Sequence, residues 1–217
     1  LQGFEVDVME AVAEEMDGPL FLKVHDCFYR NRAGDPVFGA DACRGVVHIV
    51  RHPCAVAASY AQHLHRPLDE TIELMANEDA LHDWRSDGID TLLPQRIGSW
   101  SSHCASWLDQ EEIPRLTLRY EDLVREPEVH FSALLEFAGE AADRDRAADA
   151  VEACRFEKLR DLEADRGFHE KPGDRPFFRR GQADGWRDEL SEAQVERIFA
   201  DHGAMMARLG YGRREVQ

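Results

Sequence analysis

The sequence is poor in the features that mark membrane proteins, disulfide-rich proteins and zinc proteins. No apolar stretch approaches the roughly 18 residues that a membrane-spanning helix needs, and the acidic start of the chain does not resemble a signal peptide. The five cysteines are odd in number and contain no C-x-x-C pair, which favours free thiols in a reducing compartment over a disulfide framework. No set of cysteines and histidines has zinc-ligand spacing, so we expect no metal site. These absences favour a cytoplasmic protein.

Positive charge is also scarce. The 217 residues include 26 Lys and Arg against 43 Asp and Glu, which gives a net charge of −17. An acidic surface repels nucleic acid and anionic lipid, so we expect neither as a partner. The segment 166–187 departs from this pattern because it holds six basic and three acidic residues together with several glycines. A basic, glycine-bearing loop in an acidic protein indicates a small anionic ligand, although a solvated flexible loop would have the same composition.

The chain does contain an alternation of apolar strands and amphipathic helices. Short apolar runs predict strands over 20–24, 45–50 and 116–120. Helical spacing of apolar residues predicts helices over 4–16, 54–65, 68–86, 99–109 and 191–209, with three more helical stretches within 128–164. This order predicts an α/β fold in which helices flank a parallel sheet. Ligands of such sheets bind at the carboxyl ends of the strands.

Each predicted strand ends in side chains that can do chemistry. Lys23 and His25 close the first strand, Arg51 the second and Tyr120 the third. In a parallel sheet these residues gather at one edge. Arg51 also precedes a helix that begins with Pro53, and both a helix N-terminus and a guanidinium group favour a phosphate. The alternative for Arg51 is an ion pair with one of the many carboxylates.

Three separated segments resemble sulfotransferase motifs. The motifs are a K-[ST]-H segment, a strand–R-[NH]-P–helix motif with a serine eight residues after the arginine, and a basic loop that ends in Gly and is followed by Trp. The matching segments are Leu22–His25, Val46–Pro53 with Ser59, and Phe178–Gly181 with Trp186. Two supporting segments resemble the R-Y-E-D-L and T-S-F segments of the family; they are Leu118–Leu123 and Cys154–Phe156. All five occur in the family's order.

The resemblance implies a P-loop kinase-like, three-layer α/β fold. It also implies the donor 3′-phosphoadenosine 5′-phosphosulfate (PAPS), whose sulfuryl group passes to a hydroxyl or amine of a small-molecule or carbohydrate acceptor, with 3′-phosphoadenosine 5′-phosphate (PAP) as product and no metal. By similarity, His25 would be the general base and Lys23 would stabilise charge on the transferring group. The 3′-phosphate would be held by Arg51, Ser59, Arg179, Arg180 and Gly181. The nucleotide pocket would also include Tyr120 and Phe178, and the base would stack on Phe156.

The sequence departs from the family pattern most clearly at its start. No Lys-Ser-Gly or Lys-Ala-Gly loop occurs before residue 20, where the family has a strand and a loop for the 5′-phosphosulfate. We therefore expect residues 1–217 to form a single sulfotransferase-like domain without that strand and loop. An alternative is a non-catalytic relative that binds a nucleotide or a partner. A small-molecule kinase would need a G-x-x-x-x-G-K-[ST] loop, which the sequence does not contain. The sequence identifies neither the acceptor nor the oligomeric state.

Overall fold

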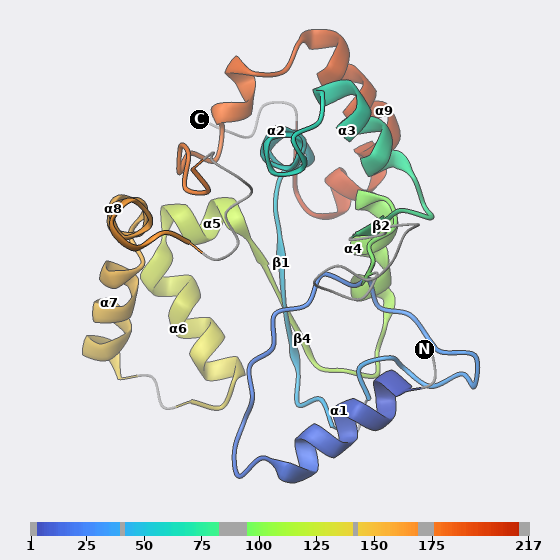
Figure 1. The fold of residues 1–217 in the computed structure, drawn as a ribbon, viewed down its shortest axis with the longest axis vertical. Coiled ribbons are helices and arrows are strands. Elements are labelled where there is room, and N and C mark those ends of the chain that lie inside the picture. The colour runs from blue at the N-terminus through green and yellow to red at the C-terminus, as the bar shows by residue number, and fades with distance from the viewer. Residues whose placement is uncertain (1–3, 40–41, 83–94, 141–142, 169–175, 213–217) are drawn as a thin grey trace. The chain divides into compact units, whose positions relative to one another are not determined.

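Two short strands with apolar and β-branched residues form the sheet that leads to the site. In the computed structural model, β1 (Val46–Val50) and β4 (Arg115–Arg119) are neighbouring strands of a parallel sheet. Each strand runs straight into a helix, β1 into α2 (Pro53–Leu64) and β4 into α5 (Tyr120–Arg125) (Figure 1). The strands predicted over 45–50 and 116–120 are therefore confirmed. They bring the residues that follow them, Arg51 and Tyr120, to the same end of the sheet.

The structure describes residues 4–39, 42–82, 95–140, 143–168 and 176–212. The chain divides into two compact units. Unit 1 comprises Leu1–His48 and Leu74–Arg115, and unit 2 comprises Ile49–Glu73 and Leu116–Gln217. The expected organisation of residues 1–217 as one sulfotransferase-like domain stays a prediction.

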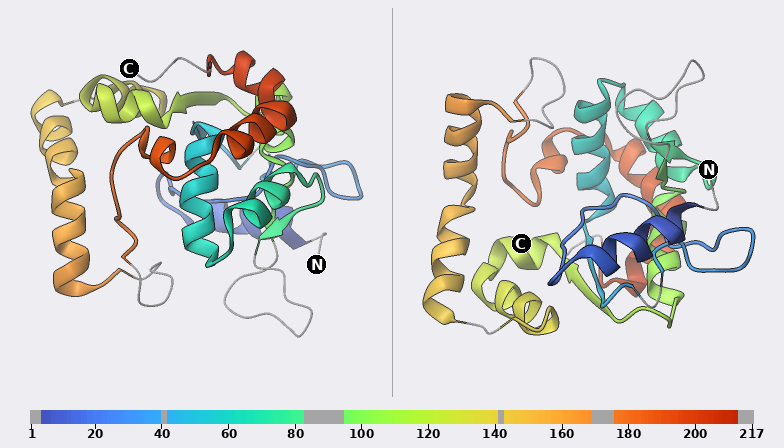
Figure 2. Two further views of the ribbon diagram at one scale, coloured as in Figure 1. Left: turned by 90° about the horizontal axis from the view of Figure 1, so that it is seen from above. Right: turned by 60° about the horizontal axis from the view of Figure 1, so that its bottom comes forward.

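Unit 2 is mainly helical. In addition to α2 and α5 it contains α6 (Pro127–Phe137), α7 (Arg144–Ala153), α8 (Phe156–Arg166), a 3₁₀ turn η1 (Gly185–Asp188) and α9 (Glu192–Arg208). After Pro53, the buried positions of α2 are small residues, which allow close approach by a neighbouring helix; they are Cys54, Ala55, Ala57, Ala58 and Ala61. Helix α2 packs against α9 and η1 (Figures 1 and 2). The buried side chains Ile198 and Met206 of α9 belong to the same unit.

Unit 1 is built around an aromatic core. It contains α1 (Phe4–Glu15), α4 (Trp100–Asp109) and a short antiparallel pair, β2 (Leu81–His82) with β3 (Gln95–Arg96). Trp107 of α4 is buried with Val37, Phe38 and Ile113. Helix α3 (Leu68–Ala76) runs from unit 2 into unit 1. The helices predicted over 4–16 and 99–109 are confirmed to within a residue at either end.

One predicted element is wrong and another is too long. Residues 20–24 form no strand, and their apolar side chains are exposed, with 66% of Phe21 accessible. An apolar run predicts a strand only if a partner strand pairs with its backbone, and no described strand does so here. The helix predicted over 68–86 ends at Ala76, where Asn77 closes a turn on Leu74. Of its remaining residues, 83–86 lie outside the described part of the chain.

The cysteines are free thiols, as predicted. Cys54 in unit 2 and Cys104 in unit 1 are both buried, and burial raises the pKa of each thiol to about 12. Among the described residues, no helix has the length and apolarity needed to cross a membrane. No group of three or more His, Cys, Asp or Glu side chains in the described ranges is arranged to hold a metal ion.

Candidate functional site

Arg51 is the point at which three separate segments of unit 2 meet. Its guanidinium carbon lies 4.4 Å from the centroid of the Tyr120 ring, at the start of α5. Its Nη2 donates a long hydrogen bond of 3.5 Å to the carbonyl oxygen of Gln182. Its Nε is buried and has no hydrogen-bond partner among the described residues. A buried N–H donor of a guanidinium without an acceptor is costly, and an anionic oxygen would satisfy it.

The sequence predicted Arg51 and Tyr120 at one edge of the sheet, and the structure brings them into contact. Ser59 was expected to share the 3′-phosphate with Arg51. It is exposed on α2 and makes no hydrogen bond to the arginine.

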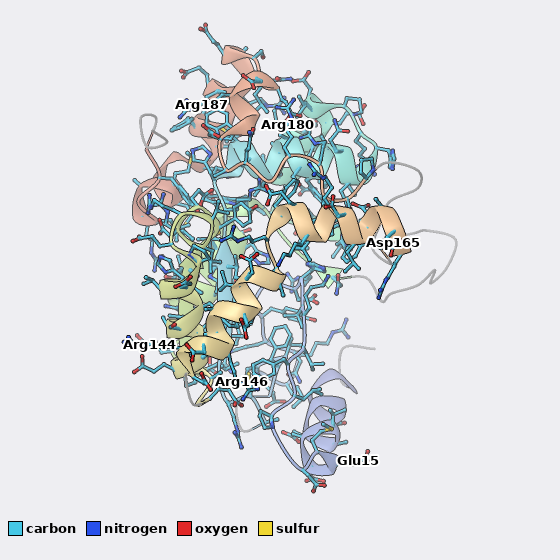
Figure 3. All side chains as sticks on the ribbon, turned by 90° about the vertical axis from the view of Figure 1, so that its left-hand side faces the viewer. Glu15, Arg144, Arg146, Asp165, Arg180 and Arg187 are labelled. Atoms are coloured by element: carbon cyan, nitrogen blue, oxygen red, sulfur yellow. The ribbon has the colours of Figure 1, made fainter. Side chains whose placement is uncertain are left out.

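The arginine loop, residues 178–182, is held beside η1. Arg179 donates from Nη2 to Oε1 of Glu189 at 2.7 Å, and Nη1 of Arg180 lies 3.5 Å from the same oxygen. Arg180, which Figure 3 labels, also donates to the carbonyl oxygen of Gly185 at 3.2 Å. Residues 188 and 189 are both acidic, and they directly follow the basic segment 166–187. The basic loop is therefore partly neutralised by carboxylates that its own composition does not include.

Gly181 has a role that its sequence position does not reveal. Its φ is +63°, a conformation that favours glycine, and a Cβ atom placed there would overlap the ring of Phe156. The ring of Phe156 also meets the ring of Phe178 edge-on, with centroids 6.4 Å apart. In this structure the glycine admits an aromatic ring of α8 against the loop backbone. A stacking contact between Phe156 and a base stays a prediction.

A buried cluster fixes the backbone next to Arg51. The backbone N–H of His52 donates to Oε1 of Glu121, and the hydroxyl of Tyr211 donates to Oε2 of the same carboxylate, each at 2.9 Å. The His52 ring stacks on Trp186 with centroids 5.0 Å apart. Its Nδ1 accepts from the backbone N–H of Cys54, which caps α2. Burial, reinforced by the charges of nearby arginines, lowers the pKa of His52 to about 4, so that Nδ1 remains an acceptor at neutral pH.

The supporting roles of His52, Glu121 and Tyr211 were not predicted. Within the sequence, Glu121 is one acidic residue among 43, and the signal for Glu121, His52 and Trp186 was only their place in family-like motifs. Apart from that motif, nothing local distinguishes this buried carboxylate from the exposed ones.

In unit 1, Lys23 and His25 lie on an irregular exposed segment, and not at the end of a strand as expected. The residues that follow them are well anchored. Asp26 accepts from the backbone N–H of Arg96 at 2.6 Å and from Nε1 of Trp107 at 3.1 Å, and the backbone N–H of Cys27 donates to the carbonyl oxygen of Arg96. The His25 ring meets the His82 ring edge-on, with centroids 5.7 Å apart. His25 is thus an exposed imidazole at the end of a fixed segment.

Comparison with known proteins gives the same family as the motifs. A family model described as a sulfotransferase domain matches residues 12–210. Cytosolic sulfotransferase 16 of Arabidopsis thaliana is 30% identical over 169 residues, which cover 70% of this chain and 48% of that relative. Cytosolic sulfotransferase 12 of the same plant is 32% identical over 104 residues, 46% of this chain and 32% of the relative. The chain thus spans half or less of the length of these two relatives.

A solved structure shares the fold. A mouse sulfotransferase crystallised with PAP superposes with a TM-score of 0.59 at 18% identity, covering 86% of this chain and 64% of the mouse chain. The prediction of a P-loop-like α/β fold with a parallel sheet flanked by helices is confirmed. Because the family model extends over most of the sequence and includes every motif named above, the chain belongs to the sulfotransferase family.

Proposed function

We propose that this chain binds PAPS through unit 2 and transfers its sulfuryl group to a hydroxyl or amine of a small-molecule or carbohydrate acceptor, releasing PAP. The observation that carries the proposal is Arg51. Its Nε is buried and unpartnered among the described residues, and the same guanidinium group contacts both Tyr120 and Gln182 of the arginine loop. A nucleotide with a 3′-phosphate would supply the missing acceptor. The mouse relative that shares the fold was solved with PAP.

The residues of unit 2 suit the recognition of a nucleotide phosphate. Arg51, Arg179 and Arg180 would donate to the 3′-phosphate, and the exposed hydroxyl of Ser59 would add a donor from α2. Arg179 and Arg180 are already oriented by Glu189, so that little side-chain entropy remains to be lost on binding. Tyr120, Phe156 and Phe178 would form the walls of the nucleotide pocket.

The chemistry would fall to the exposed segment of unit 1. PAPS supplies an activated sulfuryl group when it is bound. His25 would accept the proton of the acceptor hydroxyl, because a neutral imidazole suits a general base near pH 7. Lys23 would stabilise negative charge on the transferring group. A sulfuryl group carries less negative charge than a phosphoryl group, so the proposal requires no metal. We place the reaction in the cytoplasm.

Isothermal titration of the purified chain with PAP tests the nucleotide site. We expect low-micromolar binding, and we expect Arg51→Ala or Arg179→Ala to weaken it about 10- to 150-fold, the range for one charged hydrogen bond. Arg160→Ala is the matched control, because this exposed arginine of α8 pairs only loosely, at 3.5 Å, with Asp161. Adenosine 5′-phosphate, which lacks the 3′-phosphate, should bind more weakly than PAP.

Two outcomes would contradict the proposal. One is the absence of PAP binding by a chain shown to be folded by circular dichroism. The other is equal affinity for PAP and adenosine 5′-phosphate. If PAP binds as expected, transfer of labelled sulfate from PAPS to a panel of phenols, sterols and sugars would separate an enzyme from a relative that only binds the nucleotide.

A further inference from the structure

Helix α8 buries a carboxylate. Of its eleven residues, all within the described part of the chain, Glu163 is the buried one. Ionisable side chains are rarely buried unless they are paired, because transfer of a charge from water is costly. The position of Glu163 therefore calls for partners that repay this cost.

Within the described part of the chain, two consecutive backbone N–H groups donate to Glu163. Oε1 of Glu163 accepts from the backbone N–H of Phe177 at 2.7 Å, and Oε2 accepts from the backbone N–H of Phe178 at 2.9 Å. Hydrogen bonds to an ionised acceptor are roughly twice as strong as neutral ones. Phe177 and Phe178 directly precede Arg179 and Arg180. One carboxylate thus fixes the backbone on the N-terminal side of both arginines.

The same helix also fixes the other side of the arginines. Phe156, the first residue of α8, lies against the backbone at Gly181. Arg179 and Arg180 are therefore held between two attachments to α8, one polar through Glu163 and one aromatic through Phe156. Figure 3 shows α8 and labels Arg180. Two attachments this close in sequence leave the arginine backbone little freedom to rotate.

We propose that Glu163 is a positioning residue that orients the arginine loop for the 3′-phosphate of the nucleotide. This inference rests on the proposed function. A carboxylate is required because two N–H donors need two acceptor oxygens. A glutamine in its place offers one acceptor oxygen. Its amide N–H groups would face the second backbone N–H, and two donors cannot form a hydrogen bond with each other. If the role of Glu163 were purely structural, its substitution would change the stability of the chain but not the preference for a nucleotide with a 3′-phosphate.

The test compares two nucleotides with two variants of α8. We expect Glu163→Gln to weaken PAP binding about 5- to 20-fold, since loosened arginines lose part of their charged hydrogen bonds. The affinity for adenosine 5′-phosphate should change less than about twofold, because this nucleotide has no 3′-phosphate for the arginine loop to bind. The control is Glu157→Gln, an exposed glutamate on the same helix, which should change neither affinity.

The results separate the two levels of the proposal. If the native chain does not bind PAP, the proposed function and the role of Glu163 both fail. If the native chain binds PAP and Glu163→Gln weakens both nucleotides equally, or neither, the positioning role alone is overturned. If the Glu163→Gln variant does not fold, hydrogen exchange of the backbone amides in the native chain tests the attachment of the loop to Glu163. Slow exchange at the Phe177 and Phe178 amides is expected, and exchange as fast as that of exposed loop amides would overturn the attachment.

Discussion

Gly181 shows how a single missing side chain shapes the loop. Its left-handed backbone and the ring of Phe156 both exclude a Cβ atom at this position. The two constraints are independent, since one concerns the backbone dihedral angle and the other the neighbouring ring. They can be separated experimentally.

We expect Gly181→Ala to lower the free energy of unfolding by about 2 to 5 kcal/mol, the sum of about 1 to 2 kcal/mol for a left-handed alanine and about 1 to 3 kcal/mol for an overpacked contact. In a Phe156→Ala background the ring is absent, and the same substitution should cost about 1 to 2 kcal/mol, the backbone share. Urea unfolding of the four proteins measures both values. An equal cost in the two backgrounds would show that the ring does not constrain the loop.

At the residue scale, the sequence could indicate the arginine loop but not its supports. Arg179, Arg180 and Gly181 are recognisable because basic residues beside a glycine are unusual in a chain this acidic. Glu163 and Glu189 are not, because each is one of 43 acidic residues and only burial or an ion pair distinguishes them. Burial depends on chain segments that are distant in sequence.

At the scale of elements, the junction between β1 and α2 is built around a neutral histidine. His52 lies between the end of β1 and the start of α2; it caps α2, and its ring stacks on Trp186. The Nδ1 atom that accepts the Cys54 N–H must be unprotonated to do so. The stability of this junction should therefore depend on pH.

The sign follows from the two pKa values. Burial lowers the pKa of His52 from 6.5 to about 4 in the folded chain, so the unfolded chain binds a proton first as the pH falls. The free energy of unfolding should be constant above about pH 7, as far as His52 contributes, and should decrease as the pH falls from about 6.5 to about 4.

His52→Asn tests this dependence, because asparagine can cap α2 but does not titrate. The decrease in stability between pH 6.5 and pH 4, measured by urea unfolding, should be smaller in the variant than in the native chain. It should not vanish, since burial also lowers the pKa of His48 to about 4. An unchanged slope would mean that His52 is not the titrating group.

The elements also show which patterns a sequence can specify. The apolar run of β1 is followed by Arg-His-Pro, so strand, turn and helix start were all predictable from adjacent residues. The run at 20–24 has equally apolar residues but no described partner strand, and a strand requires one. The helix over 68–86 was predicted too long because the segment contains several Glu and Leu residues, which are good helix formers, and the turn at Asn77 overrides them.

At the scale of the whole molecule, the candidate residues divide between the two units. The arginines, Tyr120 and Phe156 belong to unit 2, and Lys23 and His25 belong to unit 1. Under the proposed function, nucleotide binding and proton transfer should therefore respond to different substitutions.

We expect His25→Ala to lower kcat by about 10²- to 10⁴-fold, the usual range for loss of a general base. The Kd for PAP, measured by titration, should stay within about twofold of the native value, because His25 is not part of unit 2. His130→Ala on α6 is the matched control. Full turnover by a folded His25→Ala variant would rule out His25 as the base.

The two buried thiols offer a separate readout of each unit. Cys54 is fully buried in unit 2, and 3% of Cys104 is accessible in unit 1. A thiol with a raised pKa and no access to solvent reacts with an alkylating reagent only when its surroundings open. Labelling followed by peptide mass spectrometry would thus give two opening rates from one native sample. Equal rates would mean that the units open as one cooperative body, and unequal rates would rank them.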